Sequence, residues 1–93
     1  MTSGFECTDK TKRLIAGDML VKYYHADMED RDPKLTEILN QIEDEEEFSD
    51  ILYYIYGEGV STYIAGDYVY ISESVCKKHR RRMLDKIVKY MGI

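Results

Sequence analysis

Four residues of the chain have side chains that bind zinc well: Cys7, His25, Cys76 and His79. Cys76 and His79 are separated by two residues, which gives half of the spacing of a structural zinc site. Such a site needs about four ligands, and Cys7 and His25 are too far apart in sequence to form a second local pair. We therefore expect Cys76 to be a small buried residue, His79 to lie on the surface, and no metal to be bound.

Two further ligand-binding motifs begin in the sequence without being completed. The sequence opens like a calcium-binding loop at Asp27, Glu29 and Asp30, but Arg31 occupies the fifth loop position and Asp32 stands where the EF-hand requires glycine. Residues 57–59 read Gly-Glu-Gly, as in a dinucleotide-binding loop, but Thr62 occupies the position of the third glycine. No phosphate-binding P-loop occurs either. The sequence therefore predicts no cofactor.

Catalysis would have to depend on histidine. Small ribonucleases use histidine as acid and base beside cations that stabilise charge. Nothing in the sequence brings His25 and His79 together, and His79 lies in a run of basic residues that is typical of a solvated face. We therefore expect a binding protein that is not an enzyme.

The size and composition of the chain fit one small domain. It has 93 residues, of which 44% are hydrophobic, and its formal net charge is −5. We expect a single domain over residues 1–93, with a flexible N-terminus over residues 1–8. No apolar run reaches the length of a membrane span, and the N-terminus has no apolar signal region. Two cysteines without such a signal favour the cytoplasm, which would be the host cytoplasm for a virus-encoded protein.

The net charge conceals a strong asymmetry along the chain. Residues 27–50 contain eleven acidic and two basic residues, a net charge of −9. Residues 77–93 contain seven basic residues and one acidic residue, a net charge of +6. Tyrosine is also abundant, with nine Tyr beside two Phe and no Trp. Its ring is apolar and its hydroxyl is polar, so tyrosine favours half-buried layers and interfaces.

Three helices are predicted in the first part of the chain. Thr8 or Asp9 can cap a helix that runs to about residue 27. Asp32 followed by Pro33 is a helix start, and apolar residues then recur at helical spacing up to residue 42. The next apolar stripe, over residues 48–55, lies on a different side of a continuous helix. We expect a break near Asp44 and a third helix that ends at Gly57, although one long bent helix is the alternative.

A β-hairpin and a fourth helix are predicted to follow. Residues 60–72 suit a hairpin with a two-residue turn at Gly66-Asp67. In that register an aliphatic face packs on the core, and the opposite face, which is the more exposed, consists of Tyr63, Ala65, Tyr68 and Tyr70. Ser72 or Ser74 can cap the last helix, and Gly92 can end it. Its predicted apolar stripe is Cys76, Met83, Leu84, Ile87, Val88 and Met91. The predicted fold class is therefore α+β, a small domain of three helices, a two-stranded antiparallel hairpin and a C-terminal helix. This order is winged-helix-like, by analogy of element order only.

The leading functional hypothesis is an acidic surface that binds a protein partner. Closely spaced carboxylates can imitate a nucleic-acid backbone, and exposed tyrosines can anchor an interface. Small acidic domains without catalytic residues are typical of viral or mobile-element inhibitors of nucleic-acid-processing complexes, including proteins of the anti-CRISPR type. The predicted partner is a protein with a basic surface, and the predicted contact residues are Glu43, Asp44, Glu45, Glu46, Glu47, Asp50, Tyr63, Tyr68 and Tyr70.

The alternative hypothesis is a nucleic-acid-binding regulator that uses the basic C-terminal helix. Four cations on this helix would contact phosphates. A third reading pairs the basic helix with the acidic segment, within the chain or across a homodimer. The residues of the nucleic-acid hypothesis are Lys77, Lys78, Arg81 and Arg82.

Overall fold

The computed structural model describes residues 8–93, so the N-terminal segment that we expected to be flexible lies outside the described residues except for Thr8. This part of the chain consists of helices and loops and contains no strand. In chain order the elements are α1 (Asp9–His25), the 3-10 helix η1 (Met28–Asp30), α2 (Pro33–Glu45), α3 (Asp50–Leu52), the π-helix η2 (Tyr53–Gly57), α4 (Thr62–Tyr68) and α5 (Glu73–Met91).

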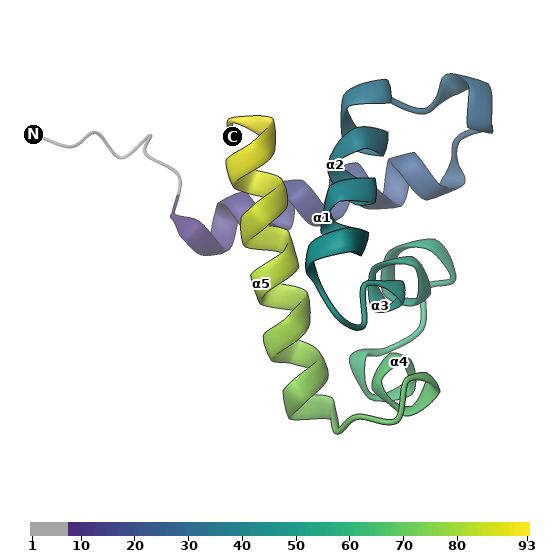
Figure 1. Cartoon of the computed structure of the whole chain (residues 1–93), viewed down its shortest axis with the longest axis vertical. Coiled ribbons are helices and arrows are strands. Elements are labelled where there is room, and N and C mark those ends of the chain that lie inside the picture. Colours follow the sequence, from purple (N-terminus) through teal and green to yellow (C-terminus); the bar gives the residue numbers. More distant parts are fainter. Residues whose placement is uncertain (1–7) are drawn as a thin grey trace, which may run out of the picture.

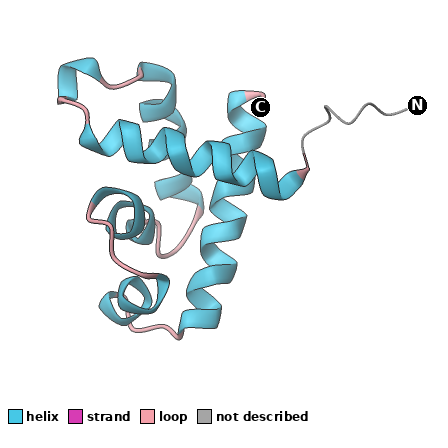
Figure 2. Ribbon diagram, turned by 180° about the vertical axis from the view of Figure 1, so that it is seen from behind, coloured by secondary structure: helices cyan, strands magenta, loops and turns pink. Residues whose placement is uncertain are grey.

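The helices are arranged around α5. Figure 1 shows α5 running down the molecule, with α1 passing behind its C-terminal half and α2 beside it. Near the N-terminal half of α5, α3 and α4 are seen almost end-on, so they cross α5 steeply. The reverse view in Figure 2 shows α1 in front of α5. Among residues 8–93, no helix combines the length and the apolar character that a membrane span requires.

The first helix begins and ends with side-chain hydrogen bonds to its backbone. Thr8 Oγ1 accepts a hydrogen bond from the backbone N–H of Thr11 at 3.1 Å, which confirms one of the two predicted caps. At the other end, Arg31 donates from Nε to the carbonyl of Tyr23 at 3.0 Å and from Nη2 to that of Tyr24 at 3.3 Å. The guanidinium also lies 4.9 Å from the centre of the Tyr23 ring. Arg31 therefore supplies donors to two carbonyls of the last turn, where Tyr23 otherwise receives only a 3.4 Å bond from the N–H of Ala26.

The start of α2 and the break after it were predicted from the sequence. Asp32 accepts a hydrogen bond from the backbone N–H of Lys34 at 2.9 Å, and Pro33 is the first helical residue. The helix continues to Glu45, and the chain then turns, with Phe48 at a φ of +58°. The break therefore lies a few residues beyond Asp44, which does not cap the next helix. The single long helix considered as the alternative is wrong.

The third predicted helix is present but changes its winding. After α3 the chain continues as a π-helix whose last residue is Gly57, the predicted end. The N–H of Glu58 donates to the carbonyl of Tyr53 at 2.9 Å, five residues earlier. A Cβ on Gly57 would lie 2.7 Å from the Tyr53 ring. Glycine at this position therefore gives the Tyr53 ring room to fold back over the helix.

The predicted β-hairpin over residues 60–72 is wrong, and with it the α+β class and the winged-helix-like order. These residues form α4, which begins where Ser61 Oγ accepts from the N–H of Ile64 at 3.2 Å. Gly66 lies inside this helix and not in a turn. Ala65 and Gly66 are buried, and with Thr62 and Val69 they follow the i, i+3, i+4, i+7 spacing of a helix. This face consists of small side chains, so it gave a weak apolar signal.

The core lies where α1, α2, α3 and α4 meet α5. The predicted apolar stripe of α5 is confirmed in its buried members, Cys76, Met83, Leu84 and Ile87. They contact buried residues from the other helices, chiefly Leu20, Leu35, Ile38, Ile42, Ile51, Leu52 and Ala65. Ser72 caps α5, and Gly92 ends it at a φ of +73°, both as predicted. One face of α5 is therefore fixed in the core and the other faces outward.

Candidate nucleic-acid interface

A tight turn joins α4 to α5. The N–H of Ile71 donates to the carbonyl of Gly66 at 2.9 Å, and that of Tyr70 donates to the carbonyl of Asp67 at 3.2 Å. These two bonds are the pair that defines a Schellman ending of a helix. The motif places Tyr70 in the left-handed region, at a φ of +63°. Only Val69, Tyr70, Ile71 and Ser72 lie between the two helices, so the position of α5 is fixed relative to α4.

The left-handed backbone at Tyr70 leads to a prediction on stability. The side chain is 95% exposed, so little packing is lost when it is replaced. Tyr70→Gly relieves the left-handed strain, whereas Tyr70→Val puts a β-branched residue where the backbone disfavours it most. Urea denaturation should find the glycine variant more stable than the valine variant by at least about 1 kcal/mol. Equal stability of the two variants would contradict the turn geometry.

The contact between α4 and α5 depends on Gly66. A Cβ at this position would lie 2.9 Å from the carbonyl oxygen of Ile71 and 3.2 Å from the Cβ of Cys76. Cys76 is itself fully buried. The two helices therefore approach more closely than any larger residue would allow. Two helices joined by a four-residue turn, with a small residue at their crossing, form a helix-turn-helix arrangement.

The outward face of α5 is basic. Counting from Lys78, positions i+3, i+4, i+7 and i+11 share one side of a helix, and they are Arg81, Arg82, Asp85 and Lys89. All five side chains are exposed, as is Lys77 at the edge of the same face. The carboxylate of Asp85 accepts a hydrogen bond from Arg13 Nη1 at 3.1 Å. The acidic residue on this face is therefore paired with a cation from α1.

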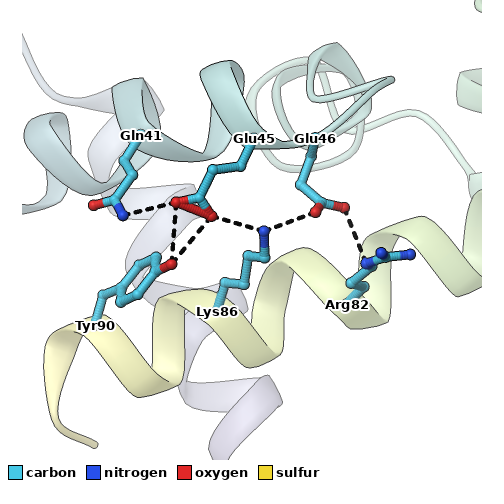
Figure 3. Close-up of polar contacts among 6 residues, drawn as sticks. All are labelled: Gln41, Glu45, Glu46, Arg82, Lys86 and Tyr90. Atoms are coloured by element: carbon cyan, nitrogen blue, oxygen red, sulfur yellow. Dashed lines mark hydrogen bonds and ion pairs between the residues drawn. The ribbon is translucent and has the colours of Figure 1, made fainter.

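The side of α5 that faces α2 carries a network of ion pairs (Figure 3). Lys86 Nζ lies 2.8 Å from a carboxylate oxygen of Glu45 and 2.7 Å from one of Glu46. Arg82 Nε lies 3.3 Å from the other oxygen of Glu46, whose side chain is only 5% exposed. The Tyr90 hydroxyl and the Gln41 amide donate to Glu45. Part of the acidic segment is thus paired with the basic helix inside the chain.

This network predicts a dependence of stability on pH. The hydrogen bond from Lys86 lowers the pKa of Glu45 from its ordinary value of 4.5. The bonds to Glu45 and Glu46 raise the pKa of Lys86 from its ordinary value of 10.5. The Glu45 contribution is therefore present above pH 4.5 and lost as the pH falls through the lowered pKa. The Lys86 contribution is present below pH 10.5 and lost as the pH rises through the raised pKa.

We therefore expect Lys86→Gln to lower the free energy of unfolding at neutral pH and to have a smaller effect in acid. Urea denaturation of both proteins, at about pH 7 and again below about pH 4, measures the difference. Lys89→Gln is the matched control, because Lys89 makes no ion pair among residues 8–93. A Lys86→Gln effect that is the same at both pH values would contradict this account.

The predicted acidic contact residues fall into two groups. Glu45 and Glu46 are held by α5, and the side chain of Glu46 is nearly buried. The other four are exposed and make no ion pair among the described residues: Glu43, Asp44, Glu47 and Asp50. The acidic surface is therefore smaller than the sequence indicated.

The predicted tyrosines are exposed, although they do not share the face of a hairpin. Tyr63, Tyr68 and Tyr70 all have exposed side chains around α4, whereas Ala65, predicted beside them, is fully buried. Tyr68 is also the end of a series of edge-to-face ring contacts that passes through Tyr54, Tyr53, Tyr24 and Tyr23, with centroids 5.0 to 5.9 Å apart. Burial raises the pKa of Tyr24 to about 12. Tyrosine rings therefore pack against one another inside the molecule, and other tyrosine side chains are exposed around α4.

His25, Cys76 and His79 do not form a common metal-binding group. His25 Nε2 lies 3.0 Å from the carbonyl oxygen of Gly57. The His79 ring packs edge-on against Phe48, so the expectation of a surface histidine is wrong. Cys76 is fully buried, as expected, and Cys7 lies outside the described residues. Residues 8–93 contain no group of three His, Cys, Asp or Glu side chains that could hold a metal ion.

Sequence reasoning missed the residues that position α5. The signals were present in Ser61, which caps α4, and in the small residues Ala65 and Gly66 at helical spacing. A comparison of the chain with models of protein families, with curated proteins and with solved structures found no match.

Proposed function

We propose that the protein binds duplex nucleic acid, and DNA in particular, through α5. The supporting observation is the exposed basic face of a helix that follows a tight turn and a short crossing helix. In helix-turn-helix proteins the second helix lies in the major groove while the first helix crosses the backbone. In this chain α5 would be the helix in the groove, and α4 with its exposed tyrosines would lie near the phosphates.

The distribution of charge supports this role for α5. Arg82 and Lys86 form ion pairs with Glu45 and Glu46. Four cations of α5 make no ion pair among residues 8–93 and are exposed: Lys77, Lys78, Arg81 and Lys89. Asp85, the acidic residue on this face, is paired with Arg13, so the exposed face of α5 keeps a net positive charge. Lys77, Lys78 and Arg81 therefore remain proposed phosphate contacts, as in the hypothesis from the sequence. Arg82 also forms an ion pair with Glu46.

The proposal is tested by the binding of the purified protein to a fluorescent duplex of about 20 base pairs at low salt. We expect a dissociation constant in the micromolar range or tighter. Lys77→Gln/Lys78→Gln should weaken binding by at least about tenfold, because two phosphate contacts are lost. Lys22→Gln/Lys34→Gln removes the same charge from exposed positions on α1 and α2, and it should change the affinity less than about twofold.

The outcomes of this experiment decide the proposal. No binding at low salt would refute it. Equal loss of affinity in both double variants would show attraction by overall charge and would remove α5 from the account. Circular dichroism spectra that match the wild type would show that the variants are folded.

The exposed carboxylates favour a second candidate, the binding of a protein with a basic surface as in an inhibitor. Glu43, Asp44, Glu47 and Asp50 are free to make such a contact. Replacing these four with their amides should abolish capture of a basic partner, and unchanged affinity at low salt would refute it. Both candidates are binding functions without catalysis.

We also propose that the protein works in a reducing compartment such as the cytoplasm. The buried thiol of Cys76, which forms no disulfide among residues 8–93, suits such a compartment.

A further inference from the structure

A groove lies where α1 crosses α5, the two helices that Figure 2 shows one in front of the other. Its volume is about 490 Å³, which lies in the range of about 300 to 1,000 Å³ that is typical of small-molecule sites. It follows α1 from Lys10 to Val21, a length of about 16 Å at the helical rise per residue. Leu84 of α5 and Tyr56 of η2 also line it. The groove therefore has the volume and the length to hold a small molecule with an extended chain.

Gly17 gives the groove an aromatic wall. A Cβ at this position would lie 3.1 Å from Cε1 of the Tyr56 ring and 3.5 Å from its hydroxyl oxygen. Glycine inside a helix costs about 1 kcal/mol relative to alanine, and here the missing side chain lets the ring lie against the backbone of α1. Burial raises the pKa of the Tyr56 hydroxyl above its ordinary value of 10.0. This wall therefore stays uncharged at neutral pH.

Two large apolar side chains in the groove are exposed. Leu14 is 63% exposed and Val21 is 40% exposed, and both come from α1. Removing apolar surface from water contributes about 25 cal/mol per Å². An occupant with an apolar chain would therefore gain free energy by covering these side chains.

The charged residues that line the groove are mostly basic. Arg13 is already paired with Asp85, and Asp18 is the one carboxylate among the lining residues. Three lining cations make no ion pair among residues 8–93: Lys10, Arg80 and Arg81. The groove therefore has a surplus of positive charge in a chain whose net charge is −5. An occupant that complements both the charge and the apolar walls has an anionic group on an apolar body.

We propose that this groove binds a small anionic amphiphile, a carboxylate with an apolar chain such as a fatty acid. The carboxylate would lie beside Lys10, which is about 12 Å along α1 from Asp18, so that repulsion by Asp18 is weak there. The chain would extend over Leu14 and past the Tyr56 ring toward Val21. The proposal does not depend on nucleic-acid binding.

The test is isothermal titration calorimetry of the full-length protein with dodecanoate, below the concentration at which it forms micelles, at neutral pH and low salt. We expect a dissociation constant in the micromolar range. Dodecyltrimethylammonium has the same chain and the opposite charge, and it should bind at least about tenfold more weakly. The net charge of −5 favours this cation over the whole surface, so tighter binding of the anion requires a local basic site. No binding of dodecanoate, or equal affinity for the two probes, would overturn the proposal.

Matched variants identify the groove as the site. Leu14→Asp places a carboxylate in the groove and should weaken dodecanoate binding at least about tenfold. Tyr63→Asp makes the same change of charge on α4, at a side chain that is also 63% exposed, and should alter the affinity less than about twofold. Equal losses in the two variants would overturn the assignment to the groove.

A second pair of variants tests the position of the carboxylate, and it changes only exposed side chains, so the fold is kept. Lys10→Gln should weaken dodecanoate binding at least about threefold, because an ion pair with the carboxylate is lost. Lys22→Gln removes an exposed lysine of α1 that does not line the groove, and it should leave the affinity unchanged. A Lys10→Gln variant that binds as tightly as the wild type would overturn the placement beside Lys10.

Discussion

Replacing Gly66 with alanine is expected to lower the free energy of unfolding by about 2 to 3 kcal/mol, the upper part of the range for an overpacked core. The added Cβ would lie 2.9 Å from the carbonyl oxygen of Ile71, which is backbone and cannot rotate away. The Cβ of Cys76 stands 3.2 Å away on the other side, in a buried residue. The two helices must therefore separate, and the turn that holds α5 is disturbed with them.

The sign of the Gly66→Ala effect distinguishes this account from an ordinary helix position. At an unstrained, open helical position, alanine in place of glycine stabilises a protein by about 0.4 to 1 kcal/mol. Asp67→Ala, one residue further at an exposed position of α4, is the matched control and should change stability by less than about 0.5 kcal/mol. Urea denaturation of the three proteins measures both effects. A Gly66→Ala variant as stable as the wild type would contradict the close approach of α4 and α5.

Replacing Arg31 with alanine is expected to have a similar cost, about 2 to 3 kcal/mol. The guanidinium donates to the carbonyls of Tyr23 and Tyr24 and lies over the Tyr23 ring. A hydrogen bond from a charged group contributes about 1.5 to 3 kcal/mol, and an exposed cation–π contact about 0.5 to 1 kcal/mol. Without Arg31 the end of α1 would lose two side-chain hydrogen bonds, and η1 would lose this attachment to that helix.

The matched variants for Arg31 separate geometry from charge. Arg31→Lys keeps the charge but has neither the planar donor group nor its spacing, so it should recover less than half of the lost stability. Arg81→Ala removes an exposed arginine that has no ion pair among residues 8–93, and it should change stability by less than about 0.5 kcal/mol. Full recovery by lysine would mean that the charge alone matters, against the contacts described here.

The sequence predicted helices well where a cap and an apolar stripe agree. Asp32-Pro33 and Gly92 are examples, because each signal depends on the chemistry of one or two neighbouring residues. Residues 60–72 failed for the opposite reason. Their large apolar residues alternate as in a strand, whereas the face that packs is made of Ala65 and Gly66. Small residues matter there because α5 lies close, and that proximity is not visible in a local pattern.

The sequence predicted which basic residues the candidate site contains, but not which of them form ion pairs with carboxylates. The seven basic residues of 77–93 could be counted from the sequence. Only the fold shows that Arg82 and Lys86 are paired with Glu45 and Glu46 of α2 while Lys77 and Lys78 are free of ion pairs within the described chain. In the same way, Arg31 looked like a mere interruption of a calcium loop. Its partners are backbone carbonyls eight and seven residues earlier, at the end of α1, and no sequence pattern indicates these hydrogen bonds.

The most direct test of nucleic-acid binding by α5 is the dependence of duplex affinity on salt. Each phosphate neutralised lowers the logarithm of the affinity by about 0.9 per tenfold increase in salt. If Lys77, Lys78, Arg81 and Lys89 all contact phosphates, the wild-type slope should be about −3 to −4. Lys77→Gln/Lys78→Gln should reduce its magnitude by nearly 2. A slope that is unchanged in this variant, or no measurable binding at low salt, would contradict the account.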